Sequence, residues 1–204
     1  MTYSSETGGW TSMQSRCFNV SVKSFSNLES SQSTFLSGSM HFFTCYSTIV
    51  ILDMERNAWG EIIMPPGMTN NGGDASIGQS QGRLYAWHIE NQDDCQLSVW
   101  VLEDYDSGQW TLKCTVNCFE LFGKDCRENG KSYSMFAIHP EHNLIYLTDG
   151  KEKVLSYEMD DQKVHVICTS GEFLEEGKEP QELIVRVSLI PELEVAALAW
   201  SRMY

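Results

Sequence analysis

A polar turn that ends in tryptophan recurs along this chain, and it limits the possible folds more than any other feature. The copies span residues 3–10, 52–59 and 102–110, and their tryptophans, Trp10, Trp59 and Trp110, lie 49 and 51 residues apart. A weaker fourth copy spans 157–164 and carries Val164 in place of tryptophan, 54 residues further on. A period near fifty residues indicates a stack of similar units, each too small to bury its own apolar face.

Short strand-like segments fill each unit. In the second unit, aromatic and β-branched runs at 33–36, 40–44, 48–52 and 59–64 are separated by turn residues, and two prolines end the last run. Proline cannot donate to a strand ladder, so it suits this position. The third and fourth units follow the same order, and few segments have a helical period; a single helical turn is expected at 118–122. The pattern predicts an all-β fold, a partial kelch-like β-propeller of four-stranded antiparallel blades.

The blades can be assigned along the chain. We expect one propeller domain over residues 1–204, with an incomplete first blade at 1–32, a second blade at 33–66, a third at 75–117, a fourth at 133–170 and a closing C-terminal segment at 171–204. Tyr3 already sits where the third strand of a blade would begin. We therefore expect the C-terminal part of a longer protein or a truncated copy, and the sequence leaves blade number and closure open.

The charge balance narrows the choice of partner. The chain has 28 acidic residues against 14 Lys and Arg, a formal net charge of −14. Nucleic acids and anionic membranes are bound mainly through Lys and Arg, so we expect neither as a partner. The longest apolar run, at 48–52, is too short to cross a bilayer.

The cysteines favour a reducing compartment. There are seven, an odd number, and no two are separated by only two residues. We expect reduced thiols rather than a disulfide scaffold, and a cytoplasmic or nuclear location.

Several motifs together resemble one family. They are residues 3–10, 35–41, 97–104 (LSVWVLED) followed by Trp110, 138–142 and 157–160. This combination is similar to the plant F-box proteins that carry a C-terminal F-box-associated, kelch-like domain. The resemblance implies that an F-box docks onto the Skp-type adaptor of an SCF-type cullin–RING ubiquitin ligase while the associated domain holds the target protein. No F-box precedes Tyr3, so the resemblance implies target recognition for this chain, with adaptor binding only through an F-box that it lacks.

The residues with catalytic or metal-binding chemistry fit structural roles better. His139 and His142 share one turn, and Cys114, Cys118 and Cys126 have no fourth ligand at suitable spacing, so we expect no metal site. No Gly-x-Ser-x-Gly elbow is present. His165 and Cys168 would point to opposite faces of a regular strand.

We also predict structural roles for the aspartates and tryptophans of the repeat. Asp53, Asp104 and Asp160 are expected to cap turns, and the repeating tryptophans to pack between blades, although an aromatic ligand cage would need the same residue type. We therefore predict no catalytic residue, no cofactor and no enzymatic activity. The alternatives are a propeller enzyme acting on a sugar or small molecule, recognisable by a central pocket with shifted carboxylates, or a truncated fragment without function.

A protein-binding surface remains. In a propeller, the loops between second and third strands and the connections between blades gather on one face, where exposed side chains can contact a partner. The candidates for partner binding in these loops are Tyr46, His88, Asp93, Asp94, Glu152 and Lys153.

Overall fold

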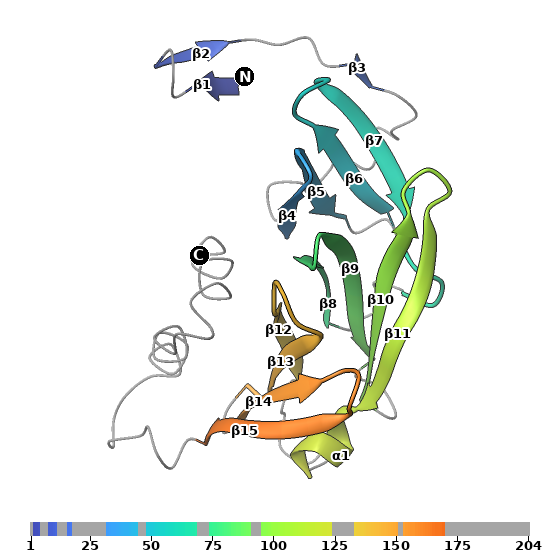
Figure 1. The fold of residues 1–204 in the computed structure, drawn as a ribbon, viewed down its shortest axis with the longest axis vertical. Helices are drawn as coiled ribbons and strands as arrows, with labels where there is room; N and C mark the ends of the chain where they lie inside the picture. The colour runs from blue at the N-terminus through green and yellow to red at the C-terminus, as the bar shows by residue number, and fades with distance from the viewer. Residues whose placement is uncertain are drawn as a thin grey trace. The chain divides into compact units, whose positions relative to one another are not determined.

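The chain is described by a computed structural model that covers residues 2–4, 8–11, 16–17, 32–44, 48–68, 74–90, 95–123, 133–150 and 153–169. It forms two compact units, Met1–Met64 and Pro65–Tyr204, whose strands can be followed in Figure 1. Each unit is considered by itself.

The first unit contains a hairpin and a larger sheet. Strands β1 (Thr2–Ser4) and β2 (Gly9–Thr11) pair antiparallel. Sheet I is an antiparallel meander of β4 (Ser33–Leu36), β5 (Ser39–Phe43), β6 (Thr48–Asp53) and β7 (Ala58–Ile63). Strand β3 (Arg16–Cys17) pairs parallel with β7. The segment expected to end the first blade or to connect it thus adds a fifth strand to the edge of sheet I.

The second unit contains two four-stranded antiparallel sheets. Sheet II is formed by β8 (Asp74–Ser80), β9 (Arg83–Glu90), β10 (Gln96–Asp104) and β11 (Gln109–Asn117). Sheet III is formed by β12 (Ser134–Ile138), β13 (Leu144–Thr148), β14 (Lys153–Glu158) and β15 (Lys163–Thr169). In both sheets the strands pair in chain order, as expected for propeller blades.

One short helix follows sheet II. Helix α1 (Cys118–Phe122) begins where the side chain of Asn117 accepts a hydrogen bond from the backbone N–H of Glu120, and it ends at Gly123, which has φ 69°. The helical turn expected at 118–122 is confirmed. Within the described ranges, no helix is long and apolar enough to cross a membrane.

The register of the strands accounts for the fifty-residue repeat. Each copy is the hairpin of the last two strands of its unit, and the repeated position always pairs across that hairpin. The pairs are Tyr3 with Trp10, Leu52 with Trp59, Leu102 with Trp110, and Tyr157 with Val164. The four copies are therefore equivalent in structure as well as in sequence.

The packing of the repeated tryptophans is only partly described. Trp59 and Trp110 are half-buried, and the Trp59 ring lies 6.2 Å from the Phe42 ring of the same sheet. The side chain of Trp10 lies outside the described residues. Packing of these three indoles between blades stays a prediction.

A different tryptophan lies between sheets II and III. Trp87, which the sequence could not assign to core or channel, is 4% exposed, and its indole Nε1 donates to the carbonyl of Met135 at 3.0 Å. Gly78 faces the same ring: a Cβ on Gly78 would lie 3.0 Å from Trp87 and 3.2 Å from Ile138. The missing side chain of Gly78 therefore allows β8, β9 and β12 to approach closely.

A continuous core joins the two sheets around Trp87. It takes alternate residues from β9, β10, β13 and β14, and it also includes Phe122 of α1, whose ring stacks on Tyr133 at 5.0 Å. Burying so many large side chains between two sheets supplies the main favourable free energy for their association. Sheets II and III thus form one packed body.

One cysteine departs from the expected redox state. Cys95 is disulfide-bonded, whereas Cys114, Cys118 and Cys168 are thiols. The expectation of reduced cysteines is therefore wrong for Cys95.

Candidate functional site

The second unit has two ends with different chemistry. The turns at 81–82, 105–108, 140–143 and 159–162 lie at one end of sheets II and III, which we call the turn end. The strand ends Glu90, Gln96, Thr148 and Lys153 and helix α1 lie at the other, which we call the loop end. Because antiparallel strands alternate in direction, every first-to-second and third-to-fourth strand connection falls at the turn end.

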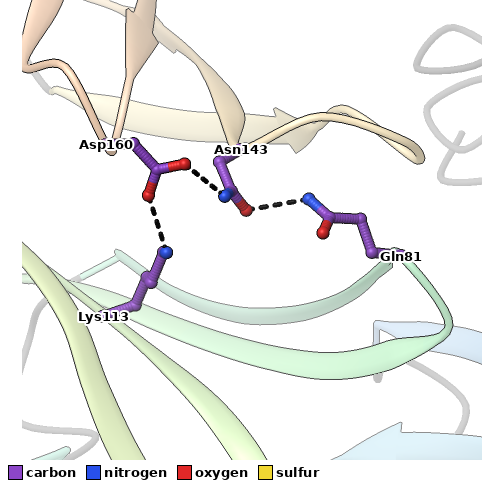
Figure 2. A network of polar contacts seen from close by, with 4 residues as sticks. All are labelled: Gln81, Lys113, Asn143 and Asp160. Carbon is purple, nitrogen blue, oxygen red and sulfur yellow. Dashed lines mark hydrogen bonds and ion pairs between the residues drawn. The ribbon is translucent and has the colours of Figure 1, made fainter.

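A chain of four polar side chains links the sheets at the turn end (Figure 2). Lys113 of β11 donates from Nζ to Asp160 Oδ1 at 2.8 Å. Asn143 donates from Nδ2 to the other carboxylate oxygen, Asp160 Oδ2, at 2.5 Å. The Asn143 carbonyl oxygen accepts from Gln81 Nε2 at 2.8 Å. The ends of sheets II and III are therefore connected twice, from β11 and from the β8–β9 turn.

Asp160 carries the charge of this network. The hydrogen bond from Lys113, and then the one from Asn143, lower the pKa of Asp160 below its ordinary value of 3.8. The same hydrogen bond, which Lys113 donates to Asp160, raises the pKa of Lys113 above 10.5. Asp160 is exposed and Lys113 is half-buried, so solvent screens the attraction and its contribution to stability is small.

Backbone groups strengthen the same connection. The backbone N–H of Gln81 donates to the carbonyl of Pro140 at 2.6 Å, and Ser80 Oγ donates to the carbonyl of His139 at 2.6 Å. Ser80 is fully buried. A buried hydroxyl that donates to a carbonyl of the neighbouring sheet fixes their relative position more firmly than an exposed ion pair.

The two histidines of the β12–β13 turn have a structural role. His139 Nδ1 accepts hydrogen bonds from the backbone N–H groups of Glu141 and His142, both at 3.1 Å. The two imidazole rings lie 4.6 Å apart. In the part of the chain that the structure describes, no group of three His, Cys, Asp or Glu could hold a metal ion. The predicted structural role of His139 in this turn is confirmed.

The turn-capping prediction holds for two of three aspartates. Asp53 Oδ1 accepts from the backbone N–H groups of Glu55 and Arg56, and Asp104 accepts from the N–H of Asp106 and the hydroxyl of Ser107. These bonds satisfy turn amides, as Asx turns do. For Asp160 the prediction is wrong, because its carboxylate binds Lys113 and Asn143.

Cys114 and Cys118 are poor nucleophiles. Burial raises the pKa of Cys114 and of Cys118 to about 12, so both are protonated near neutral pH. The prediction that His165 and Cys168 lie on opposite faces of the strand is wrong. A β-bulge at Ile167 pairs His165 with Ser156 and Cys168 with Val154, so both residues lie on the same face. His165 is nevertheless exposed while Cys168 is buried.

Two carboxyl groups in exposed turns have a lowered pKa. Hydrogen bonds lower the pKa of Asp104, chiefly the one from Ser107, and that of Asp160, chiefly the one from Lys113. A general acid near neutral pH needs the opposite shift.

The structure describes two of the six residues expected to bind a partner, His88 and Lys153, both in the second unit. Tyr46, Asp93, Asp94 and Glu152 lie outside the described residues. His88 lies near the end of β9 and is 8% exposed, so it presents little surface. Lys153 is half-buried: its backbone N–H donates to Asp149 Oδ1 at 2.9 Å, and its Nζ donates to the carbonyl of Phe122 at 3.3 Å. Lys153 thus connects the β13–β14 loop to α1.

No motif or spacing singled out Gln81, Lys113 or Asn143 as functional residues. Each is an ordinary polar residue in or near a turn, and nothing in its local sequence names a partner 17 to 62 positions away. The repeat predicted only that the loops between second and third strands and the connections between blades gather on one face, which is not the end where Gln81 and Asn143 lie.

This architecture defines a class of protein. Sheets II and III are four-stranded antiparallel meanders that pack face to face. Such sheets are the blades of a β-propeller, and this chain forms a partial one. Residues 1–188 match the family model described as "F-box protein At3g26010-like, beta-propeller". The chain belongs to this family of F-box-protein propellers.

Other comparisons concern the fold. No curated protein sequence matches the chain significantly. Among solved structures, YjhT is 11% identical with a TM-score of 0.40 over 68% of this chain and 51% of its own. The β-propeller domain of Myceliophteria thermophila Cps50 (Swd1) is 12% identical with a TM-score of 0.42 over 82% of this chain and 50% of its own. The chain therefore spans about half the length of these solved chains.

Proposed function

We propose that this chain is the target-recognition part of an F-box subunit of an SCF-type cullin–RING ubiquitin ligase, and that it binds a protein rather than catalysing a reaction. The observation that carries the proposal is the match of residues 1–188 to the propeller of an F-box protein. The Skp-type adaptor is bound by an F-box in a longer form of the protein, which acts in the cytoplasm or nucleus.

The described side chains support a binding role. The shifted pKa values of Cys114 and Cys118 come from burial, and those of Asp104 and Asp160 come from turn and inter-sheet hydrogen bonds. Each of these causes stabilises the scaffold. A rigid scaffold that presents variable loops is the usual arrangement for protein recognition.

We place the target at the loop end of the blades. The candidate contacts of the second unit are His88, Asp93, Asp94, Glu152 and Lys153, and Tyr46 stays a separate candidate contact of the first unit. Lys153 is already held by Asp149 and by the end of α1, so it offers a preorganised position beside the loops. The acidic chain, with net charge −14, suits a target with a basic surface.

Affinity purification with the longest natural protein that contains this chain tests the ligase role. Under proteasome inhibition it should recover a Skp-type adaptor, a cullin and at least one protein whose ubiquitination increases with its expression. The 204-residue chain alone should recover that target without the adaptor. Failure of the longer protein to recover any cullin-ligase subunit would refute the proposal.

Single-charge variants then test the location of the target. Asp93→Asn and Asp94→Asn should each lower target recovery. Glu55→Gln is the matched control, because Glu55 is an exposed acid in the β6–β7 turn of sheet I. Equal recovery by all three variants would exclude these two loop aspartates as contacts.

A further inference from the structure

Val164 breaks the repeat at its most regular position. In the equivalent hairpins the residue is Trp59, opposite Leu52, or Trp110, opposite Leu102, and both indoles are half-buried. Opposite Tyr157, sheet III has only valine, and Val164 is 39% exposed. The large side chain that covers this position elsewhere is thus missing from sheet III.

The face on which Val164 lies follows from strand pairing. Residues paired across antiparallel strands share a face of the sheet. Val164 pairs with Tyr157, which pairs with Ile145, and both partners belong to the core between sheets II and III. Val166 pairs with Leu155 of the same core and is 61% exposed. The two valines therefore extend the inter-sheet core to its outer rim, where it meets solvent.

Trp110 shows what normally occupies this side of a blade. Val101 of β10 belongs to the core shared with sheet III. Its neighbour Leu102 therefore points to the opposite face of sheet II, because side chains alternate along a strand. Trp110 pairs with Leu102, so it also lies on the face of sheet II that points away from sheet III. Val164 lies on the face of sheet III toward the preceding sheet. The two residues thus occupy corresponding faces of successive blades, one filled by an indole and one not.

The charges around this rim favour a basic partner. At the turn end of the second unit, the described acids outnumber the described bases by seven to three; the acids are Glu103, Asp104, Asp106, Glu141, Glu158, Asp160 and Asp161, and the bases are Arg83, Lys113 and Lys163. All three bases already form ion pairs with acids of this group. The remaining charge is negative and attracts Lys or Arg.

We propose that the rim formed by Val164 and Val166, which we call the valine rim, docks a partner-protein segment that combines an aromatic side chain with Lys or Arg. The aromatic ring takes the place of the missing indole of the repeat, and the basic residues pair with the acids of the turn end. Buried aromatic anchors surrounded by charged contacts are the usual centres of protein interfaces. This second surface rests on the protein-binding role proposed above but not on the loop-end residues.

Methyl NMR of the complete 204-residue chain with labelled valines tests the proposal. The probes are the peptides acetyl-Lys-Trp-Lys-amide and acetyl-Glu-Trp-Glu-amide. The basic peptide should produce saturable shifts of the Val164 and Val166 methyl signals, and its apparent affinity should exceed that of the acidic peptide at least fivefold. Absence of saturable shifts with the basic peptide, or equal binding of both peptides, overturns the proposal.

Matched variants separate specific docking at the valine rim from nonspecific hydrophobic binding. Val164→Trp restores the indole and should weaken binding of the basic peptide at least tenfold. Leu112→Trp, which adds an indole at an exposed position on the other face of sheet II, should leave it unchanged. Val166→Lys should also abolish binding by charge repulsion, and its 61% exposure makes it compatible with folding. Unchanged binding in a folded Val164→Trp or Val166→Lys variant refutes the site.

The result is distinguishable from failure of the proposed function. Recovery of the ligase target by Val164→Trp reports on the loop end, whereas the peptide titration reports on the valine rim. If loop-end variants lose the target while the titration shows no binding, only the valine rim is excluded.

Discussion

Replacing Gly78 by alanine should destabilise the second unit although it adds only one methyl group. The new Cβ would lie 3.0 Å from two ring atoms of Trp87 and 3.2 Å from Ile138. The indole cannot move away easily, because its Nε1 is bonded to the Met135 carbonyl and its ring is packed in the core. Overpacking of this kind costs about 1–3 kcal/mol.

A smaller effect acts in the opposite direction. Alanine restricts the unfolded chain more than glycine does, which stabilises the fold by about 0.4–1 kcal/mol where the backbone suits alanine. The net loss should be about 1–2 kcal/mol, which for a chain of this size lowers Tm by roughly 3–8 °C. Urea unfolding and calorimetry of the purified variant measure both quantities.

Gly60→Ala is the matched control. Gly60 also lies in a strand, and a Cβ there would meet nothing within 4 Å, so this variant should match or slightly exceed the wild type. A second test combines Gly78→Ala with Trp87→Leu, which shrinks the facing side chain. The double variant should lose less stability than the sum of the single changes. Equal stability of Gly78→Ala and Gly60→Ala would refute the close-packing argument.

Three further outcomes are expected. Trp87→Phe removes the indole N–H and its hydrogen bond to the Met135 carbonyl, so the free energy of unfolding in urea should fall by about 0.5–1.5 kcal/mol; a change within error would refute the role of this bond. Lys113→Met and Asp160→Asn should show a coupling of only about 0.2–1 kcal/mol in a double-mutant cycle at pH 7. Because the folded pKa of Asp160 is lowered from 3.8, that coupling should be present above the unfolded pKa and disappear as the pH falls through the folded one; a coupling that persists once the Asp160 carboxyl is protonated, as its NMR signal reports, would contradict the assignment. Cys114 and Cys118, with pKa values of about 12, should resist iodoacetamide at pH 8 in the native chain and react in urea, as peptide mass spectrometry can show; rapid native labelling would contradict their burial.

Local patterns were enough to predict the strands and their order. The apolar runs, the turn residues and the fifty-residue period predicted four-stranded antiparallel sheets, and the pairs Leu52–Trp59 and Leu102–Trp110 confirm that the repeat is a hairpin. Antiparallel meanders are dictated by residues close in sequence, so a single sequence contains most of the information needed. The capping roles of Asp53 and Asp104 were predictable for the same reason.

Errors arose where one extra residue changed the phase of a strand. The faces of His165 and Cys168 were predicted from regular alternation, but the bulge at Ile167 places both on the same face. Because side chains alternate with a period of two, a single inserted residue reverses every later assignment. The error for Asp160 has another cause: its partners are Lys113 of sheet II and Asn143 of the β12–β13 turn, and neither belongs to its own turn.

The sequence by itself determined the repeating unit, because short-range alternation and turn chemistry decide where strands begin, reverse and pair. The tertiary structure alone decided which residues join one sheet to the next: Trp87 against Gly78 and Met135, and Lys113, Asn143 and Gln81 around Asp160. These contacts connect side chains far apart along the chain, and their geometry exists only when two sheets pack face to face. Since no local pattern records that packing, the joint between blades, and the valine rim beside it, could be found only in three dimensions.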